Sequence, residues 1–176
     1  MTTSADISIR RAEAADAATI ARLGAATFTE TFGHLYQPED LQAFLSSSRS
    51  EERYVRMLES PRTGLWLAVA NGNEPIGYAV AGACKLPVEN LEPDAGEVQE
   101  LYVISRYHGR RLGTTLLETA LEWLEAERFS PLYVGVWSEN FGAQRLYGRY
   151  GFEKVGEYGF PVGDHIDREF ILRRFR

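Results

Sequence analysis

The amino-acid sequence predicts a mixed α/β fold in which one sheet of about seven strands is flanked by helices. Seven segments are rich in β-branched, aromatic and small residues and are bounded by turn-forming residues, as strands are. Other segments carry apolar residues at the 3.6-residue period of an amphipathic helix. We find no repeat, low-complexity stretch or linker in the 176 residues. We therefore expect a single domain spanning residues 1–176.

The first part of the chain predicts a strand and three helices. Ile7 and Ile9 alternate with polar residues, as in a short strand. Over residues 16–32 the apolar residues return at helical spacing. Pro38 opens a second helix, because proline suits the first turn and the acids that follow suit the positive end of the helix dipole. Residues 51–58 predict a third helix.

A hairpin and a further strand follow. The segments 64–70 and 76–86 are rich in β-formers, and the turn-forming residues between them predict an antiparallel hairpin. Cys84 falls within the second strand, where we interpret it as a buried small hydrophobe rather than a nucleophile. Prolines and acids in residues 87–96 predict a surface loop that leads into a strand over residues 97–104.

The C-terminal part predicts helices and strands in alternation. Leucines over residues 112–124 lie on one helical face. A strand over residues 132–137 precedes a short helix over residues 140–150, and Gly151 stands where a left-handed helix end is expected. The last two strands are predicted over residues 152–160 and 166–175.

Composition and charge exclude several classes of protein. The chain has 19 Lys and Arg against 25 Asp and Glu, a net charge of −6, which suits a nucleic-acid partner poorly. Its longest apolar run, residues 65–70, is too short to cross a bilayer, so we expect no membrane partner. The first residues resemble no secretory leader, and we expect a cytoplasmic protein. The three histidines lack metal-ligand spacing, so no metal site is expected.

A basic, glycine-containing turn between a strand and a helix, residues 101–116, predicts an anion site. The first N–H groups of a helix have no internal partner and lie at its positive end, where they can bind a pyrophosphate. Gly109 and Gly113 would let such a ligand approach closely. Neither of the two best-known phosphate-loop motifs is present. Taken alone, the turn is explained equally well as a tight connection with solvated arginines.

A second motif follows the strand at 132–137. Its residues are spaced as Asn-x-x-Ala-x-x-Leu-Tyr-x-x-x-Gly-Phe, and they are Asn140, Ala143, Leu146, Tyr147, Gly151 and Phe152. Together, the two segments resemble the GCN5-related N-acetyltransferases (GNAT), which bind acetyl-CoA at a Gln/Arg-x-x-Gly-x-Gly/Ala turn. The turn itself matches less completely. His108 stands where Gln or Arg is usual, Arg111 replaces the first glycine, and Gly113 agrees.

The resemblance implies a twisted, mostly antiparallel sheet and an acetyl-CoA-dependent N-acetyltransferase that moves the acetyl group directly onto a primary amine. The backbone of residues 101–103 would contact the thioester oxygen and pair with the pantetheine arm. Arg111, with Arg106 or Arg110, would meet the 3′-phosphate. Asn140 would either cap its helix or bond the pantetheine. The implied acetyl-CoA site comprises Leu101, Tyr102, Val103, His108, Gly109, Arg110, Arg111, Leu112, Gly113, Thr114 and Asn140.

Acetyl transfer also requires a base and an acid. A primary amine has a pKa near 10.4 and must lose a proton before it attacks, a task suited to a carboxylate. Strand alternation predicts Glu97 and Leu101 on one face and Glu100 on the other. Glu97 also lies at the spacing at which family members with a glutamate base carry it, so we expect Glu97 to be the base. By the same resemblance, Tyr147 would protonate the leaving CoA thiolate. A purely structural role is the alternative for both.

The acceptor is less closely specified. Residues 27–33, 135–140 and 162–164 resemble a subgroup that includes bacterial spermidine/spermine acetyltransferases. A small-molecule polyamine would favour an acidic rim, with Glu30, Glu89, Glu92, Asp94 and Glu97 as candidates. The alternatives are an acetyltransferase acting on a protein or peptide amine and a non-catalytic, regulatory acyl-CoA-binding module. A homodimer is compatible with the sequence.

Overall fold

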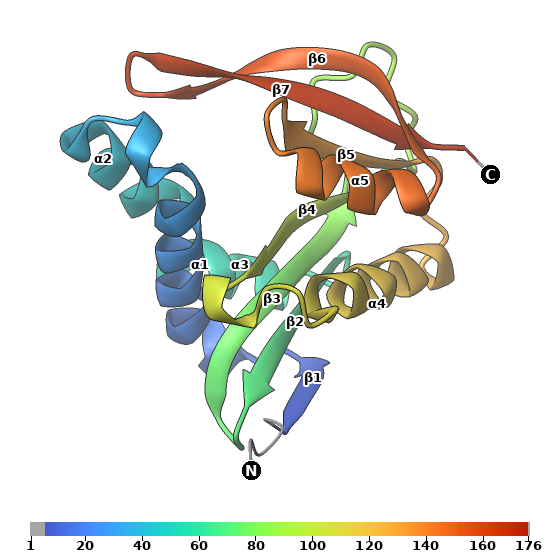
Figure 1. Cartoon of the computed structure of the whole chain (residues 1–176). Coiled ribbons are helices and arrows are strands. Elements are labelled where there is room, and N and C mark those ends of the chain that lie inside the picture. The colour runs from blue at the N-terminus through green and yellow to red at the C-terminus, as the bar shows by residue number, and fades with distance from the viewer. Residues whose placement is uncertain (1–5, 176) are drawn as a thin grey trace.

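The fold is a seven-stranded mixed sheet with helices on both faces (Figure 1). The computed structural model describes residues 6–175. Residues 1–5, on which the expectation of no secretory leader partly rests, lie outside the described residues. The strands are β1 (Ile7–Arg11), β2 (Thr63–Ala70), β3 (Glu74–Ala83), β4 (Gly96–Val103), β5 (Leu132–Trp137), β6 (Phe152–Val162) and β7 (His165–Arg174). The helices are α1 (Ala17–Phe32), α2 (Pro38–Ser48), α3 (Glu51–Glu59), α4 (Leu112–Ala126) and α5 (Phe141–Arg149).

The strand order is β1-β2-β3-β4-β5-β7-β6. The pair β4–β5 is parallel, and the other neighbouring pairs are antiparallel. The prediction of a mixed, mostly antiparallel sheet of seven strands is therefore confirmed. The predicted helices are present within a few residues, and the backbone at Gly151, with φ of 83°, is left-handed as expected after α5.

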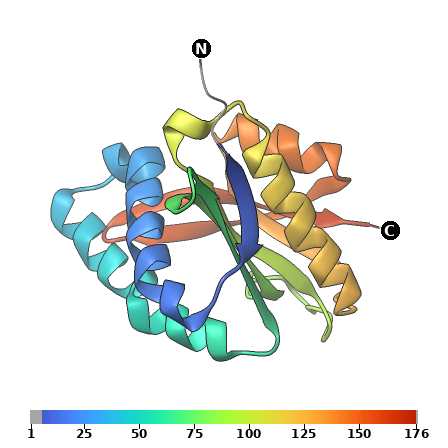
Figure 2. The same cartoon turned by 90° about the horizontal axis from the view of Figure 1, so that it is seen from below.

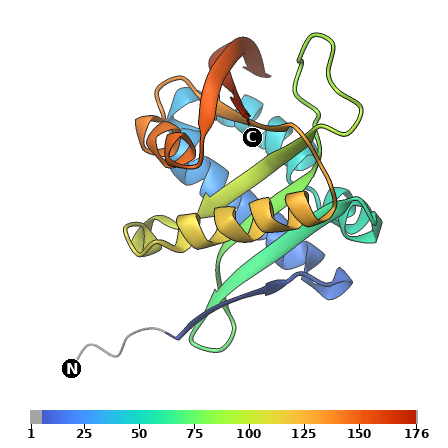
Figure 3. The same ribbon diagram turned by 90° about the vertical axis from the view of Figure 1, so that its right-hand side faces the viewer.

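Strand alternation divides the core into two layers. Along β2, Leu65 and Leu67 pack with α1 and α3, whereas Trp66 and Ala68 pack with the leucines of α4. Figure 2 shows α1 and α3 on one side of the sheet and α4 on the other. Figure 3 shows α4 lying across the face formed by the central strands. Both helical layers hold β4 in place, so its position is fixed from two sides.

The second strand of the hairpin ends earlier than predicted. It ends at Ala83, not at residue 86, so Cys84 lies one residue beyond the strand and is partly buried. The chain turns here because the backbone N–H of Lys85 donates to the Glu97 carboxylate at 2.8 Å. A side-chain acceptor thus replaces the next strand partner.

A β-bulge at Gln99 reverses the expected faces of β4. Val80 pairs with Glu100 and Ala81 pairs with Val98, which leaves Gln99 as an extra residue. Val98 therefore packs in the α4 layer, and Glu97, the residue before it, faces the same side as Glu100. The prediction that Glu97 shares the face of Leu101 is wrong, because simple alternation does not hold across a bulge.

The sheet splits between β4 and β5. These strands pair only at Gly96 with Leu132 and at Glu97 with Tyr133, and they then diverge (Figure 1). The edge of β4 beyond Glu97 consequently has no strand beside it on that side. A Cβ at Gly96 would come within 2.7 Å of Phe129 and 3.0 Å of Leu132, so the close approach at the start of the split requires glycine.

We expect Gly96→Ala to lower the free energy of unfolding by about 1–3 kcal/mol, because its methyl group would overpack the start of the split. Gly113→Ala is the matched control, since a Cβ there meets no heavy atom within 4 Å. Urea unfolding measures both. A Gly96→Ala protein as stable as the wild type would contradict the packing described here.

Candidate active site

Two cavities meet where β4 and β5 separate. The first, of about 320 Å³, is called the acidic cavity here, and its glutamates are Glu97, Glu100 and Glu169. The second, of about 520 Å³, is called the basic cleft, and its basic residues are His108, Arg111 and Arg149. Within residues 6–175, no lysine or arginine lines the acidic cavity and no acid lines the basic cleft. The residues that line both are Leu101, Val103, His108, Asn140, Ala143 and Tyr147.

The basic cleft fits the diphosphate of coenzyme A. Leu112, Gly113 and Thr114 begin α4, where the N–H groups have no acceptor within the helix. The backbone is left-handed at Gly109 and Arg111, with φ of 77° and 61°. A Cβ at Gly113 would meet no heavy atom within 4 Å. The helix start therefore presents free donors beside open space, as an anion site requires.

Arg111 adopts the backbone conformation for which glycine is usual. A left-handed conformation costs a residue with a side chain about 1–2 kcal/mol, yet the turn keeps it. Arg111 lines the basic cleft together with Arg149, which was not predicted from the sequence. Arg106 instead forms an ion pair with Glu74, and Arg110 lies over a tyrosine ring at 5.1 Å. Within residues 6–175, the arginines that line the cleft are thus Arg111 and Arg149. The contact of Arg106 or Arg110 with the 3′-phosphate stays a prediction.

Most of the predicted acetyl-CoA site lines the basic cleft. Tyr102 and Arg110 do not, and Tyr102 faces the α1 and α3 layer, where its ring stacks on Tyr78 at 5.8 Å. The predicted residues that do line the cleft are Leu101, Val103, His108, Gly109, Arg111, Leu112, Gly113, Thr114 and Asn140.

Two polar residues hold the elements around the junction of the cavities. His108 donates from Nε2 to the carbonyl of Val103 at 2.7 Å, which ties the loop before α4 to the end of β4. Asn140 caps α5, since its Oδ1 accepts from the N–H of Ala143 at 3.1 Å. The Asn140 Nδ2 makes no hydrogen bond within residues 6–175 and is left to donate elsewhere. Asn140 can therefore cap α5 with its Oδ1 and still donate to pantetheine from its Nδ2.

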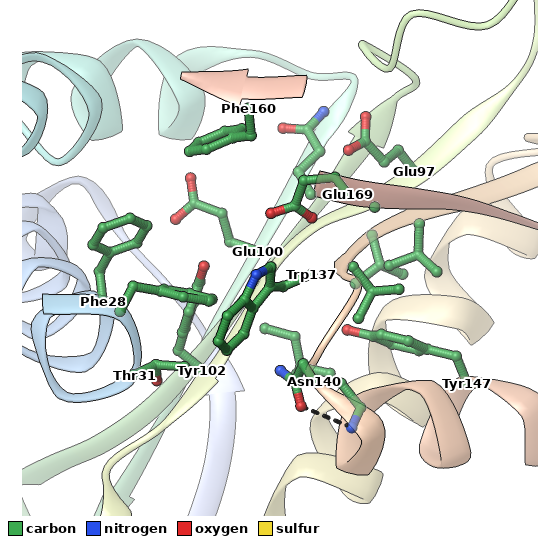
Figure 4. Close-up of a pocket in the computed structure, with 18 of the residues that line it drawn as sticks. Phe28, Thr31, Glu97, Glu100, Tyr102, Trp137, Asn140, Tyr147, Phe160 and Glu169 are labelled. Atoms are coloured by element: carbon green, nitrogen blue, oxygen red, sulfur yellow. Dashed lines mark hydrogen bonds between the residues drawn. The ribbon is translucent and has the colours of Figure 1, made fainter. Parts of the chain in front are cut away.

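Aromatic rings form much of the acidic cavity wall (Figure 4). The described aromatic residues that line it are Phe28, Phe32, Tyr36, Tyr102, Trp137, Tyr147, Tyr158 and Phe160. They come from α1, the turn after it, α5 and strands β4 to β6, so the cavity depends on most of the fold. Rings beside carboxylates suit an organic cation, which gains from both ion pairing and cation–π contacts.

Glu97 has the properties of a general base. Its side chain is almost fully buried, and the Lys85 N–H donates to its carboxylate at 2.8 Å. Burial raises the pKa of Glu97 to about 7, although the Lys85 contact opposes this shift. A base with a pKa near neutrality can accept a proton at physiological pH and release it afterwards.

Glu100 lies on the same face but has structural partners. The hydroxyls of Tyr54 and Tyr78 each donate to it at 2.7 Å, and Arg53 approaches it at 2.6 Å. Burial alone would raise the pKa of Glu100, but the charges of Arg49 and Arg53 and the two hydroxyls lower it. Glu100 is therefore an ionised, fully engaged carboxylate, which is unsuited to accept a proton.

Tyr147 lies at the junction of the two cavities. It is buried in α5, and Figure 4 shows its hydroxyl directed toward the cavity. Within residues 6–175 that hydroxyl makes no hydrogen bond, which leaves it available to a ligand. Burial raises the pKa of Tyr147 well above its ordinary value, so the hydroxyl keeps its proton at neutral pH. A protonated hydroxyl at this junction can serve as a general acid.

The predicted acidic rim is largely elsewhere. Of its five residues, Glu97 lines the acidic cavity and the other four do not. Glu30 accepts from the Ser105 N–H at 3.0 Å, and Glu92 pairs with Arg173 at 2.9 Å. Glu169, on β7, supplies a carboxylate that was not predicted from the sequence.

Other expected features concern thiol chemistry, metals and membranes. Burial raises the pKa of Cys84 to about 12, which leaves a thiol rather than a nucleophilic thiolate at neutral pH. In the part of the chain that the structure describes, no three His, Cys, Asp or Glu side chains are grouped to hold a metal ion. No helix in residues 6–175 has the length and apolar character needed to cross a bilayer.

The site and fold define an enzyme that brings acetyl-CoA and an amine together at one junction. Residues 27–152 match the acetyltransferase (GNAT) family, and the chain belongs to that family. It is an acetyl-CoA-dependent N-acetyltransferase, as the sequence motifs predict.

Known relatives extend this comparison. An uncharacterized N-acetyltransferase in the pepI 3′ region of Lactobacillus delbrueckii subsp. lactis is 29% identical over 153 residues, 84% of this chain and 85% of that protein. The spermine/spermidine N(1)-acetyltransferase of Bacillus subtilis is 28% identical over 86 residues, 48% of this chain and 57% of that protein. The PaiA N-acetyltransferase of Thermoplasma acidophilum, solved with coenzyme A, has a TM-score of 0.75 at 18% identity, with 97% of this chain and 99% of that chain covered.

We expect Gly113→Leu to weaken coenzyme A binding about tenfold or more, because its side chain would occupy the open space beside the α4 N-terminus. Gly148→Leu is the matched control, since Gly148 is also helical, also faces open space and lines neither cavity. Calorimetric titration with coenzyme A measures the effect, and thermal unfolding checks that both variants fold. Equal affinities in the two variants would show that coenzyme A does not occupy this cleft.

Proposed function

We propose that this N-acetyltransferase acts as one catalytic domain on a primary amine of a small, positively charged molecule, with polyamines as the leading class. The observation that carries the proposal is the acidic cavity, whose carboxylates and aromatic rings face a space that no described lysine or arginine lines. A cationic amine is the ligand that this lining favours. The local similarity to a Bacillus subtilis spermine/spermidine acetyltransferase supports the same class of acceptor.

In this proposal Glu97 is the general base and Tyr147 the general acid. Glu97 lines the acidic cavity but not the basic cleft. In the acidic cavity it takes the proton from the acceptor ammonium, directly or through water. Tyr147 lines both cavities, so it can donate its proton to the sulfur at the junction. Bound acetyl-CoA supplies the activated thioester. Within residues 6–175, the edge of β4 at Leu101 and Val103 has no strand beside it on the β5 side. Its backbone groups, apart from the Val103 carbonyl that accepts from His108, hold the acyl arm through hydrogen bonds.

Contacts between the N-terminal helices and the β6–β7 hairpin beside the acidic cavity favour a small acceptor over a protein or peptide. The hydroxyl of Tyr36, in the turn after α1, donates a hydrogen bond to the buried Asp167 of β7. Phe28, Tyr36 and Val162 form an apolar cluster at the same place. Helices α1 and α2 are thereby joined to the β6–β7 hairpin, which leaves less room beside the cavity for an extended peptide than for a small amine. The raised pKa of the buried Glu97 carboxyl, and a Tyr147 hydroxyl that makes no hydrogen bond within residues 6–175, support a catalytic domain over a non-catalytic module.

We expect Glu97→Gln and Tyr147→Phe each to lower kcat for spermidine acetylation by about 10²–10⁴-fold, because each removes a proton-transfer group. Thiol release from acetyl-CoA, measured across a panel of monoamines, diamines and peptides, tests the roles and the acceptor class together. Glu92→Gln and Tyr150→Phe are matched controls, since neither residue lines the acidic cavity. Unchanged rates in both catalytic variants would remove this mechanism, and acetylation of peptides alone would remove the small-amine proposal.

The pH dependence provides a second test. Glu97 must be ionised to accept a proton, and its pKa is raised to about 7 by burial, so kcat/KM for a monoamine such as n-butylamine should rise with pH through about 7. Deprotonation of the amine adds a separate rise at higher pH. Glu97→Gln should lose the inflection near pH 7 and keep the second rise. An inflection that persists in Glu97→Gln would assign the base to another group.

A further inference from the structure

Glu169 is a carboxylate in the acidic cavity that the proposed proton transfers do not use. It lies on β7, where it pairs with Trp137 of β5 on one side and with Tyr158 of β6 on the other. All three side chains line the cavity, and Figure 4 shows the Glu169 carboxylate directed into it. The aromatic neighbours therefore frame a single negative group.

The Glu169 carboxylate lacks a partner among residues 6–175. It forms no hydrogen bond or ion pair there, although its side chain is partly buried. The nearest arginines along β7 are engaged elsewhere, since Arg168 pairs with Glu157 at 2.8 Å and Arg173 pairs with Glu92 at 2.9 Å. Burial, with a contribution from the Asp167 charge, raises the pKa of Glu169 to about 7. A partly buried carboxylate that has no partner within the described residues is stabilised most by a cation that a ligand brings.

The other acids of the cavity have defined roles or partners. Glu100 pairs with Arg53 and accepts from two tyrosine hydroxyls. Asp167, which lies two residues before Glu169 and does not line the cavity, accepts from Tyr36 and from His165 Nε2. Glu97 faces the cavity from β4, whereas Glu169 faces it from β7, on the other side of the split. Two available carboxylates on opposite strands match a ligand with two nitrogen atoms.

We propose that Glu169 is a specificity-determining residue that binds a second, protonated amino group of the acceptor, so that the enzyme prefers diamines and polyamines to monoamines. This inference rests on the proposed function, since it assumes a small amine in the acidic cavity. One nitrogen is deprotonated at Glu97 and acetylated, and the other stays charged at Glu169 against the rings of Trp137 and Tyr158. No covalent step involves Glu169.

The test compares n-butylamine with 1,4-diaminobutane, which differ by one amino group, at saturating acetyl-CoA. Wild-type enzyme should show a kcat/KM at least tenfold higher for the diamine. Glu169→Gln should remove most of that preference, mainly through a higher KM for the diamine, and should leave kcat/KM for butylamine within about twofold. Glu169→Asp should restore part of the preference. Glu157→Gln, which removes an exposed acid from β6, should leave kcat/KM unchanged for both substrates.

The outcomes separate this inference from the function on which it rests. If wild-type enzyme acetylates both amines with equal kcat/KM, or Glu169→Gln lowers both equally, the specificity role is wrong while small-amine acetylation stands. If wild-type enzyme acetylates no diamine or polyamine, the proposed function and the inference both fail. Calorimetric titration of the coenzyme A complex with 1,4-diaminobutane gives an independent readout, since Glu169→Gln should weaken diamine binding at least tenfold even in a variant of low activity.

Discussion

The parting of β4 from β5 is the constraint on which the rest of the site depends. After two residue pairs the strands separate, and the edge of β4 is left without a strand partner in the middle of the sheet. Partly buried backbone donors and acceptors gain from partners, so an open edge at this position can accept a ligand that pairs like a strand, as we propose for the acyl arm. Gly96 permits the close approach at the closed end, and the bulge at Gln99 turns Glu97 toward the acidic cavity. The glycine, the bulge and the open edge together define one reaction site.

Electrostatics divides that site into two halves. The cleft at the start of α4 presents backbone donors and basic side chains, whereas the cavity behind it presents carboxylates and rings. Three glutamates in that cavity differ in pKa and in partners because their surroundings differ. The arginines beside Glu100 lower its pKa and keep it ionised, whereas burial raises the pKa of Glu97 to about 7. Glu169 has no hydrogen-bond or ion-pair partner among residues 6–175. Tyr147 lies where the two halves meet. In the proposed mechanism, the proton that Glu97 takes and the proton that Tyr147 gives therefore belong to one acetyl transfer.

Much of this structure could be predicted from the sequence, because its signals are local. Hydrophobic periodicity predicted the order of elements, and the turn at residues 101–116 together with the spacing from Asn140 to Phe152 identified the family. The face of Glu97 was predicted incorrectly, because a bulge is determined by pairing with a distant strand. Arg149 and Glu169 were missed for a related reason. Each becomes part of a cavity only through packing between segments far apart in the chain, and neither carries a local motif.

The most direct test is a crystal structure of the protein with a conjugate that joins coenzyme A to spermidine through an acetyl linker. We predict that the pantetheine arm lies along Leu101 to Val103 in the split, with the diphosphate at the start of α4. The linked nitrogen should lie within hydrogen-bond reach of Glu97, directly or through one water, and the polyamine arm should extend into the acidic cavity. A conjugate bound outside the split, or with its polyamine arm directed away from Glu97 and the acidic cavity, would contradict the central role of the β4–β5 separation.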